Sequence, residues 1–317
     1  MTCREMKKPN FDYIDTDVAY LLGMIVARGT FHQEGDIRRL IIQFPYRHDA
    51  MTPVPDSQIR IGRETALRLS LDGIRARITE LLEVDLRVKQ KKHEVSLSAV
   101  FPRETIGWRD LRLMTDRKSS YLEFKVPEII FAADAGIQKE FVRGIADTSC
   151  DPSYADRDQA ERQRIVIQVQ FGNWILPIQL CRLLQENLNI PVSNILWGHP
   201  NLRAPGGGSG WAKETRIRIF AEAFEPIGFH FDYKQEIFAE MVRFNKERRD
   251  PAPKVCNPKE RRIRDRKPHH EDECSERLPE SLRGKHFNSY YKVCTALGCK
   301  QGKKGPQREL FCMGEED

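Results

Sequence analysis

The chain has no long apolar run. Across its 317 residues there is no stretch of eighteen consecutive apolar residues, so the sequence predicts no membrane-spanning helix and no membrane partner. The first residues, 1–8, carry charges with no apolar segment behind them, and we therefore expect no signal peptide. Both absences favour a cytoplasmic protein, nucleoid-associated if bacterial or archaeal. In that setting the eight cysteines are expected to be reduced.

The chain also has little net charge. A formal charge of +6 favours a polyanionic partner only weakly. The charge is unevenly distributed, because the segment from Arg243 to Lys267 holds eleven Lys or Arg, four Asp or Glu and three prolines. Such a block is typical of a solvated linker, and contact with nucleic acid is its commonest specific use. The composition leaves both interpretations open.

An internal repeat organises most of the remaining sequence. A helix-length run comes after Asp15, and a second one after Asp134. The side chain of an aspartate before a helix can accept a hydrogen bond from an unpaired N–H of the first turn, so both runs have a candidate N-cap residue. Each run also carries a glycine in its middle, Gly23 in the first and Gly144 in the second. Gly29 stands where the first helix should end, at a position that tolerates positive φ.

The segments after the two helices match as well. Each run is followed by a β-rich segment, a helical segment and two strands. After the first run these segments are 37–44, 64–82, 87–91 and 94–100. After the second run they are 162–171, 174–188, 193–197 and 215–221. The pattern predicts an α+β protein with a duplicated αββαββα core and pseudo-two-fold symmetry. We place the first repeat at 12–125, the second at 126–244, a basic linker at 245–268 and a small C-terminal module at 269–317.

The two helices resemble those of a known family. The segments YLLGMIVARG, from Tyr20, and FVRGIADTSC, from Phe141, are similar to the two signature helices of monomeric LAGLIDADG homing endonucleases, and the resemblance extends over about 12–244. It implies that the helices pack side by side on the pseudo-two-fold axis, with Gly23 and Gly144 allowing close backbone approach. A glycine within a helix costs about 1 kcal/mol relative to alanine, so two at matched positions need a packing reason. It also implies two sheets that form a saddle in the major groove of DNA.

The resemblance further implies an acidic residue at the foot of each helix, where the pair holds divalent metal ions such as Mg²⁺. The matching positions carry Arg28 and Ser149. Arginine repels a cation and serine is a poor ligand, so we expect a degenerate catalytic site in which Arg28 pairs with a DNA phosphate. Asp147 lies about 200° around the helix from Ser149 and should face elsewhere. The acids that could substitute are Glu34, Asp36, Asp147 and Asp151.

Strand alternation indicates which side chains would read DNA. Arginine pairs well with guanine and glutamine with adenine. A solvated sheet face also carries polar residues, but a face rich in Arg and Gln with few acids favours DNA. We expect the DNA contacts to come from Arg28 and from strand residues of both repeats: Arg38, Gln43, Arg162, Arg164, Gln168, Gln170, Arg216 and Arg218.

The C-terminal module is rich in potential metal ligands. Five of the eight cysteines lie between Cys256 and Cys312, in a segment with little apolar content. We expect a structural zinc ion there, because four Cys or His ligands leave no open coordination position. The spacing fits no standard zinc finger, and a helical tail with buried cysteines is the alternative. The expected ligands are His270, Cys274, Cys294 and Cys299, with Cys256 or His286 as substitutes.

Together these features predict a sequence-specific double-stranded DNA-binding protein that acts as a regulator or as the recognition part of a larger system. A pseudo-symmetric chain needs no partner to complete the saddle, so we expect a monomer. Two alternatives remain open. One is a Mg²⁺-dependent site-specific DNA endonuclease, of homing or restriction type, with relocated acids. The other is a maturase-like RNA-binding protein.

Overall fold

The computed structural model describes residues 14–46, 51–53, 60–91, 94–102, 105–150, 152, 162–170, 172–200, 213–247 and 286–287. No helix within these ranges is long and apolar enough to cross a membrane. Several predicted site residues lie outside the described residues: Asp151 and the zinc ligands Cys256, His270, Cys274, Cys294 and Cys299. Of His286 only the backbone is described.

The first half of the chain forms one antiparallel sheet with helices on one of its faces. The strands are arranged in the order β1-β2-β6-β5, and β3 and β4 form a separate small ribbon. The elements are α1 (Thr16–Arg28), β1 (Gly29–Glu34), β2 (Ile37–Pro45), β3 (Met51–Pro53), β4 (Arg60–Gly62), α2 (Arg63–Leu82), β5 (Leu86–Lys91), β6 (Glu94–Phe101) and α3 (Ile106–Met114).

The second half repeats this order around a second antiparallel sheet, β10-β8-β9-β7. Its elements are α4 (Glu128–Ala132), α5 (Ala135–Ser149), β7 (Arg164–Gln170), α6 (Ile175–Arg182), the π-helical turn η1 (Leu183–Asn187), β8 (Val192–Pro200), β9 (Lys213–Phe220), α7 (Ala221–Phe224), α8 (Asp232–Glu247) and β10 (His286–Phe287). Strands β7, β8 and β9 therefore correspond to β2, β5 and β6. The α+β class and the duplicated architecture predicted from the sequence are confirmed.

The helices α1 and α5 begin where the sequence predicts. The side chain of Asp15 accepts a hydrogen bond from Val18 N at 2.8 Å. Asp134 accepts from Gly136 N at 2.7 Å and from Ile137 N at 3.0 Å. Both aspartates thus satisfy first-turn N–H groups that have no partner within the helix.

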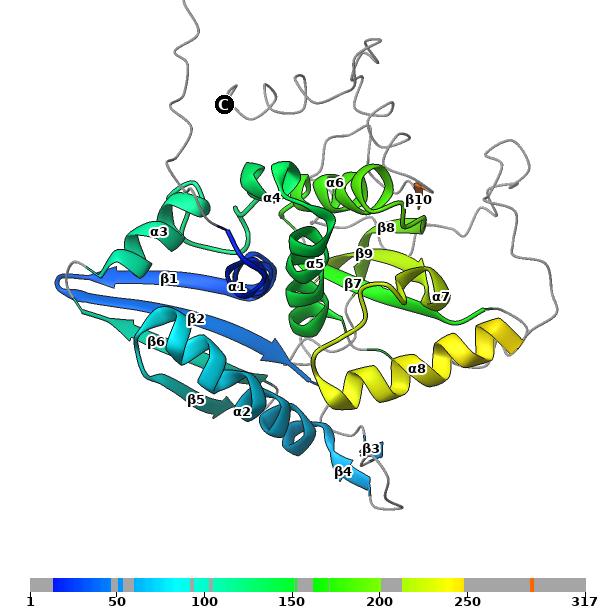
Figure 1. The fold of residues 1–317 in the computed structure, drawn as a ribbon, viewed down its shortest axis with the longest axis horizontal. Helices are drawn as coiled ribbons and strands as arrows, with labels where there is room; N and C mark the ends of the chain where they lie inside the picture. The colour runs from blue at the N-terminus through cyan, green and yellow to red at the C-terminus, as the bar shows by residue number, and fades with distance from the viewer. Residues whose placement is uncertain are drawn as a thin grey trace, which may run out of the picture.

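Helices α1 and α5 pack directly against each other at the centre of the molecule (Figure 1). A Cβ atom on Gly23 would overlap the carbonyl oxygen of Phe141 and lie 3.0 Å from Ile145 N. A Cβ atom on Gly144 would overlap the carbonyl oxygen of Tyr20 and lie 3.1 Å from Met24 N. The contact is reciprocal, so each glycine makes room for the backbone of the opposite helix.

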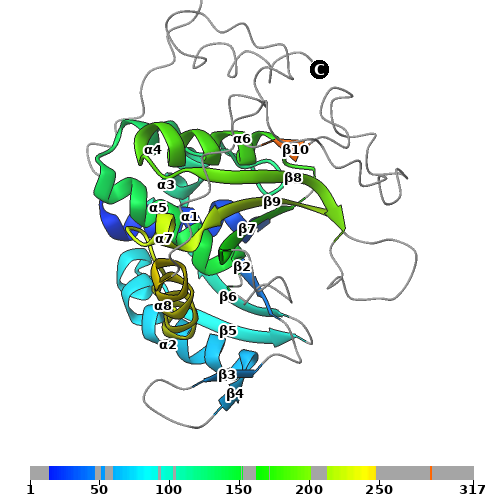
Figure 2. The same ribbon diagram turned by 90° about the vertical axis from the view of Figure 1, so that its right-hand side faces the viewer.

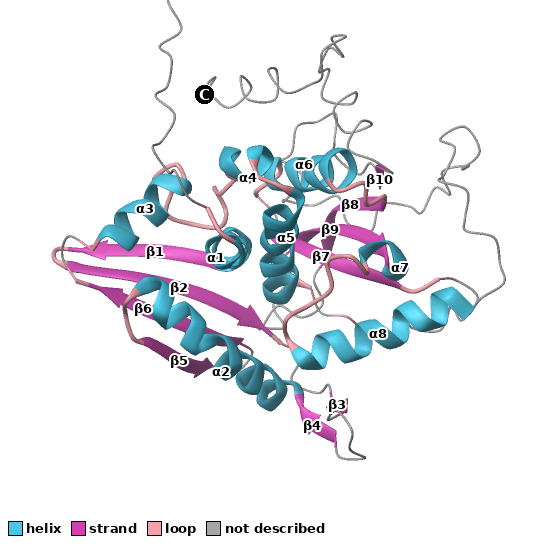
Figure 3. Cartoon of the chain, in the orientation of Figure 1, coloured by secondary structure: helices cyan, strands magenta, loops and turns pink. Residues whose placement is uncertain are grey.

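Among the described residues, each sheet is covered by helices on one face. The helix-facing side chains are apolar and buried, as with Leu40, Ile42 and Phe44 on β2 and Ile165 and Ile167 on β7. In Figure 2 the sheets form an upper arm, with β8 and β9, and a lower arm, with β5 and β6; α2 and α8 are drawn to the left of the strands, and α4 and α6 lie above the upper arm. Figure 3 shows the same separation of strands from helices. The strand side chains that point away from the helices form what we call the open face of each sheet.

Two glycines fix the backbone around β1. Gly35 has φ 57°, which suits the two-residue turn that joins β1 to β2. Gly29 has φ −85° and ψ 150°, so the positive φ expected at the end of α1 is wrong. The physical reason for glycine at this position is steric, because a Cβ would lie 2.6 Å from Ile25 O and 2.8 Å from Ile25 Cα.

Candidate nucleic-acid interface

The open face of the second sheet is rich in arginine and glutamine. Along β7 the buried side chains of Ile165, Ile167 and Val169 alternate with partly exposed ones. In the pairing with β9, Gln168 lies opposite Arg216. The face therefore brings together five of the predicted DNA-contacting residues: Arg164, Gln168, Gln170, Arg216 and Arg218.

Neighbouring side chains hold two of these arginines in place. Arg216 Nε donates to Glu214 Oε1 at 2.5 Å, and the Glu214 side chain is fully buried. The guanidinium of Arg164 lies over the Phe220 ring, 4.8 Å from its centroid, at cation–π distance. Arg162, which precedes β7, instead donates to Glu222 of α7 at 2.7 Å. Arg162 is thus held by a carboxylate of α7 and lies outside the strand itself.

The predicted residues of β2 lie on opposite faces of the first sheet. Arg38 and Gln43 are five positions apart, and side chains alternate along a strand, so they cannot share a face. Arg38 shares the helix-facing side with Leu40, and its Nε is buried with no hydrogen-bond partner among the described residues. Gln43 shares the open face with Arg39, which lies opposite Val100 of β6.

The open face of the first sheet also carries cations that were not predicted as contacts from the sequence. On β5 the exposed Arg87, Lys89 and Lys91 lie opposite Ser98, Ser96 and Glu94 of β6. Arg87 and Lys89 form no ion pair with any part of the chain that the structure describes, whereas Lys91 Nζ lies 3.0 Å from Glu94 Oε1. The alternation Arg-Val-Lys-Gln-Lys at 87–91 was the signal that could have identified them.

The strand pairings match open-face positions between the two halves. Gln43 lies opposite Ser96 on β6, and Gln168 lies opposite Arg216 on β9. Gly29 and Cys150, which each follow the packed helix glycine by six residues, lie opposite Ile42 and Ile167, so these two strand positions are equivalent. The equivalent open-face positions are therefore Arg39 and Arg164, Gln43 and Gln168, and Glu94 and Glu214. Both halves therefore present an arginine and a glutamine from the equivalent strand, four positions apart on one face.

Between the two open faces lies the C-terminal end of α1. Arg28 is only 6% exposed, and its guanidinium lies 5.9 Å from the centroid of the Tyr121 ring. Burial lowers the pKa of Arg28, while the nearby Tyr121, Glu214 and Glu94 act in the opposite direction. Arg28 is thus a buried cation within electrostatic range of the two matched strand acids.

The C-terminal end of α5 is also occupied by polar contacts. Ser149 is 4% exposed, and its hydroxyl donates to Ile145 O at 2.8 Å. Lys234 of α8 reaches the same region and donates to the carbonyls of Asp147 and Cys150. A cation at a helix C-terminus is stabilised by the helix dipole and by the carbonyls that lack partners there.

Asp147 points away from Ser149, as expected from the helical geometry. Its carboxylate accepts hydrogen bonds from Tyr20 Oη at 2.8 Å and from His230 N at 3.0 Å. The side chain is 1% exposed, and burial raises its pKa despite the opposing effect of Lys234 and the hydrogen bonds. Asp147 therefore connects α5 to α1 and to the segment before α8.

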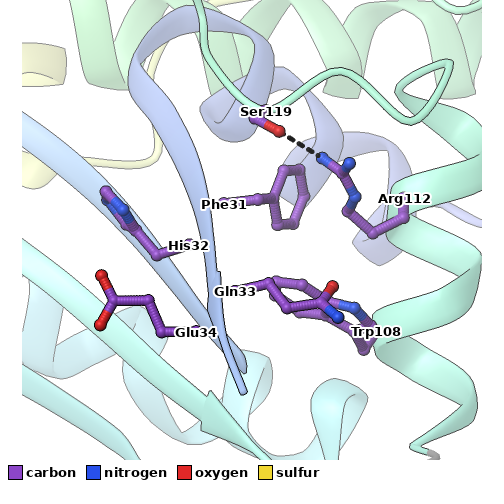
Figure 4. A pocket seen from close by; sticks show the side chains of 7 residues that line it. All are labelled: Phe31, His32, Gln33, Glu34, Trp108, Arg112 and Ser119. Atoms are coloured by element: carbon purple, nitrogen blue, oxygen red, sulfur yellow. Dashed lines mark hydrogen bonds between the residues drawn. The ribbon is translucent and has the colours of Figure 1, made fainter. Parts of the chain in front are cut away.

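Two of the other acids lie at the far end of β1. Glu34 ends that strand and Asp36 lies in the turn after it, roughly 20 Å along the strand from Arg28 at 3.3 Å per residue. Figure 4 shows Glu34 beside a hollow of about 280 Å³, in which the Arg112 guanidinium donates to Ser119 Oγ at 3.3 Å. The structure brings neither acid to the helix ends.

The side chains at the two helix ends do not fit a divalent metal ion. Within the described ranges no group of three or more His, Cys, Asp or Glu side chains is arranged to hold one. Glu94 and Glu214 are the acids that act on this region, but the buried guanidinium of Arg28 interacts with both. A positive charge in that position opposes cation binding.

Comparison with known proteins gives similarity at the level of fold. No protein-family model and no curated protein matches the sequence. Variants of the homing endonuclease I-DmoI are similar in structure, with a TM-score of 0.40, 13% identity, and coverage of 72% of this chain and 94% of theirs. The N-terminal LAGLIDADG domain of DUF199/WhiA gives a TM-score of 0.36 and 12% identity, covering 76% of this chain and 88% of that one. Full-length DUF199/WhiA from Thermotoga maritima gives a TM-score of 0.40 and 17% identity, covering 96% of this chain and 87% of that one.

The chain's own geometry carries the assignment of architecture. Two equivalent halves, each with a helix and then an antiparallel sheet, meet at a reciprocal glycine contact between α1 and α5. This is the LAGLIDADG-type arrangement expected from the two helical segments, and that expectation is confirmed at the level of fold.

Proposed function

We propose that this chain binds double-stranded DNA in a sequence-specific manner without cutting it, as a regulator or as the recognition part of a larger system. The observation that carries the proposal is the matched pair of open faces, each with an arginine and a glutamine at equivalent positions. Side chains of these two types read the major-groove edges of guanine and adenine. I-DmoI, one of the similar structures, has been crystallised with DNA and Mn.

The central region supports binding rather than cleavage. A buried arginine and a buried lysine lie at the two helix ends, where cleavage would need metal-binding acids. A guanidinium in this position would face the phosphates of a duplex that spans both sheets, and it can pair with them. Arg28 is therefore assigned to phosphate contact, and the two open faces to base contact.

The direct test uses purified protein and a randomised duplex DNA pool in buffer with Mg²⁺, scored for retained and for cut molecules. We expect one asymmetric sequence to be enriched without cleavage. An asymmetric site is expected from the two faces, because Gln168 is opposite an arginine whereas Gln43 is opposite a serine. Retention of a structured RNA pool in preference to the duplex would favour the maturase-like alternative and overturn the proposal.

A second candidate function is Mg²⁺-dependent cleavage with relocated acids. The observation that favours it is Glu214, whose Oε2 is buried and has no hydrogen-bond partner among the described residues. Glu94 occupies the equivalent position on the other sheet. Cut product from the wild-type chain that disappears in Glu214→Gln and in Glu94→Gln would establish this function in place of the first.

The vacated positions can be tested by restoring acids. If only the acids are missing, Arg28→Asp combined with Ser149→Asp removes the opposing cation and adds two carboxylates, so Mn²⁺ should raise the melting temperature of this variant and support nicking. The single variant Ser149→Asp, which keeps Arg28, is the matched control and should show neither effect. A double variant that folds and takes up no metal would contradict the degenerate-site interpretation.

A further inference from the structure

A second cationic surface lies at the outer rim of the first sheet. It is a groove of about 610 Å³ between α2 and the edge strand β5, which are neighbours in the lower arm of Figure 2. The side chains that line it are Arg68, Asp72 and Arg75 from α2 and Leu86, Arg87, Val88 and Lys89 from β5. Four of the seven are cations and one is an acid.

Most of the positive charge in this groove is not neutralised by the residues that the structure describes. Arg75 lies 3.5 Å from Asp72, and both side chains are about half exposed, so the pairing is weak. Arg68, Arg87 and Lys89 are exposed and form no ion pair within the residues that the structure describes. A concave, exposed surface of this charge attracts a polyanion.

The groove is continuous with the open face of the first sheet. Arg87 and Lys89 belong to both surfaces, because β5 is the outermost strand and its side chains reach the rim. The path of positive charge therefore runs from Lys91 and Lys89 on the open face, around β5, to Arg68 and Arg75 on the helix side.

The equivalent rim of the second sheet differs. There β8 takes the place of β5, and its outer side is paired with β10, with the backbone of His286 opposite Leu196. Leu196 lies opposite Arg216 on β9, and Lys89 lies opposite Ser96 on β6. Because Arg216 and Ser96 are equivalent positions, Leu196 takes the place of Lys89. The open, cationic rim is thus a property of the first half among the described residues.

We propose that the groove between α2 and β5 binds the phosphodiester backbone of the same duplex that lies on the open faces, so that the DNA bends around the rim of the first sheet. Guanidinium groups pair with phosphate oxygens through two parallel hydrogen bonds, which suits Arg68 and Arg75 to this role. The inference rests on the proposed function, because it assumes a duplex on the open faces. It predicts a footprint that extends further on the side of the first half.

The test measures how binding depends on salt. Each phosphate contact contributes about 0.9 to the slope of log affinity against log salt concentration. Arg68→Ala with Arg75→Ala should therefore lower the slope by roughly 2 for a long duplex. For a duplex cut back to the length that covers only the open faces, it should leave the slope unchanged. Arg109→Ala with Lys118→Ala removes the same charge from exposed positions outside the groove, and is the matched control.

A change in the opposite direction sharpens the test. Asp72→Asn removes the one acid from the groove and releases Arg75, so it should strengthen binding to the long duplex and leave the short duplex unaffected. Hydroxyl-radical footprinting of wild type and of the double variant should show loss of protection at one flank only.

The outcomes separate the two proposals. If the wild-type chain binds no duplex, the proposed function fails. If it binds, but the groove variant and the matched control lower the slope equally for long and short duplexes, the groove is not a phosphate site and the inference fails. A groove variant that loses binding to an acidic peptide while its binding to DNA is unchanged would also overturn the inference.

Discussion

The two open faces present positive charge in different ways. On the second sheet, Arg164 and Arg216 are partly buried and are held by Phe220 and by the buried Glu214. On the first sheet, Arg87 and Lys89 are exposed and unpaired by the rest of the described structure. A side chain that is fixed before binding loses little conformational entropy when it contacts a base, whereas an exposed lysine contributes mainly charge. We infer that the second half supplies most of the sequence specificity and the first half most of the salt-dependent affinity.

Loss of the contact between the two halves should have the largest effect on the molecule. Gly23→Ala and Gly144→Ala each place a Cβ against a carbonyl of the opposite helix, and backbone atoms cannot yield as side chains do. We expect each to lower the free energy of unfolding by about 3 kcal/mol, at the upper end for overpacked cores. Urea denaturation measures this loss.

Gly73→Ala is the control for those substitutions. It also lies within a helix, α2, but a Cβ there meets nothing within 4 Å. It should raise the free energy of unfolding by about 1 kcal/mol, the difference in helix propensity. If all three alanine variants were equally stable, the close approach of α1 and α5 would be disproved.

Specificity should respond most to the second sheet. Arg216→Ala removes an arginine that Glu214 holds at the open face, and it should weaken binding to the selected duplex by about 1–3 kcal/mol while changing binding to unrelated duplex much less. The measurement is a pair of titrations at one salt concentration. Equal weakening on both duplexes would mean that Arg216 contacts phosphate rather than a base.

Salt dependence should respond most to the first sheet. Lys89→Ala should weaken binding to selected and unrelated duplexes alike, and lower the salt slope by roughly 1. The same two titrations, repeated over a salt series, provide the measurement. A change confined to the selected duplex would reverse the roles assigned to the two halves.

The smallest expected effect concerns pH. Burial raises the pKa of Glu140 on α5, but the hydrogen bond with His230 and the charge of Arg143 outweigh it, so the pKa is lowered overall. A carboxyl group whose pKa is lower in the folded state stabilises the fold at pH values above its unfolded-state pKa, near 4.5. This stabilisation is lost as the pH falls through the folded-state pKa. The equivalent position on α1 is Ala19, so the first half has no carboxylate at this position.

Glu140→Gln should therefore make stability less dependent on pH below about 5, while leaving stability at neutral pH lower than that of wild type. Thermal melts over a pH series test this. The comparison variant is Asp17→Asn. It removes another carboxylate, whose pKa is lowered by the hydrogen bond from Arg77. An unchanged pH profile for Glu140→Gln would show that its contacts contribute nothing.

The sequence predicted the repeated elements well because each carries its own local signal. The capping aspartates, the mid-helix glycines and the apolar alternation of β7 are all short-range patterns, and the structure has helices and strands at these places. The predicted helix at 174–188 contains an α-helical part and a π-helical turn, a distinction that depends on backbone hydrogen bonds such as Leu188 N to Leu183 O.

The candidate site was harder to predict because it depends on pairing between distant strands. The five-residue separation already excludes Arg38 and Gln43 from one face, but which face the helices cover depends on the tertiary fold. The burial of Leu40, Ile42 and Phe44 places Arg39 rather than Arg38 on the open face. The role of Glu214 was also hidden, since its environment combines β9 with the end of α1, far away in sequence. Lys234 likewise reaches α5 only through the tertiary fold.

The reciprocal glycine contact also fixes how far apart the two open faces are. Sliding α1 by one turn along α5 would replace Gly23 with Ala19 or Ala27 against the carbonyl of Phe141, and neither methyl group has room there. The spacing between the two recognition surfaces is therefore constant. On a duplex, where one base pair advances the axis by about 3.4 Å, the two half-sites must keep one separation, and a single inserted base pair between them should abolish simultaneous contact.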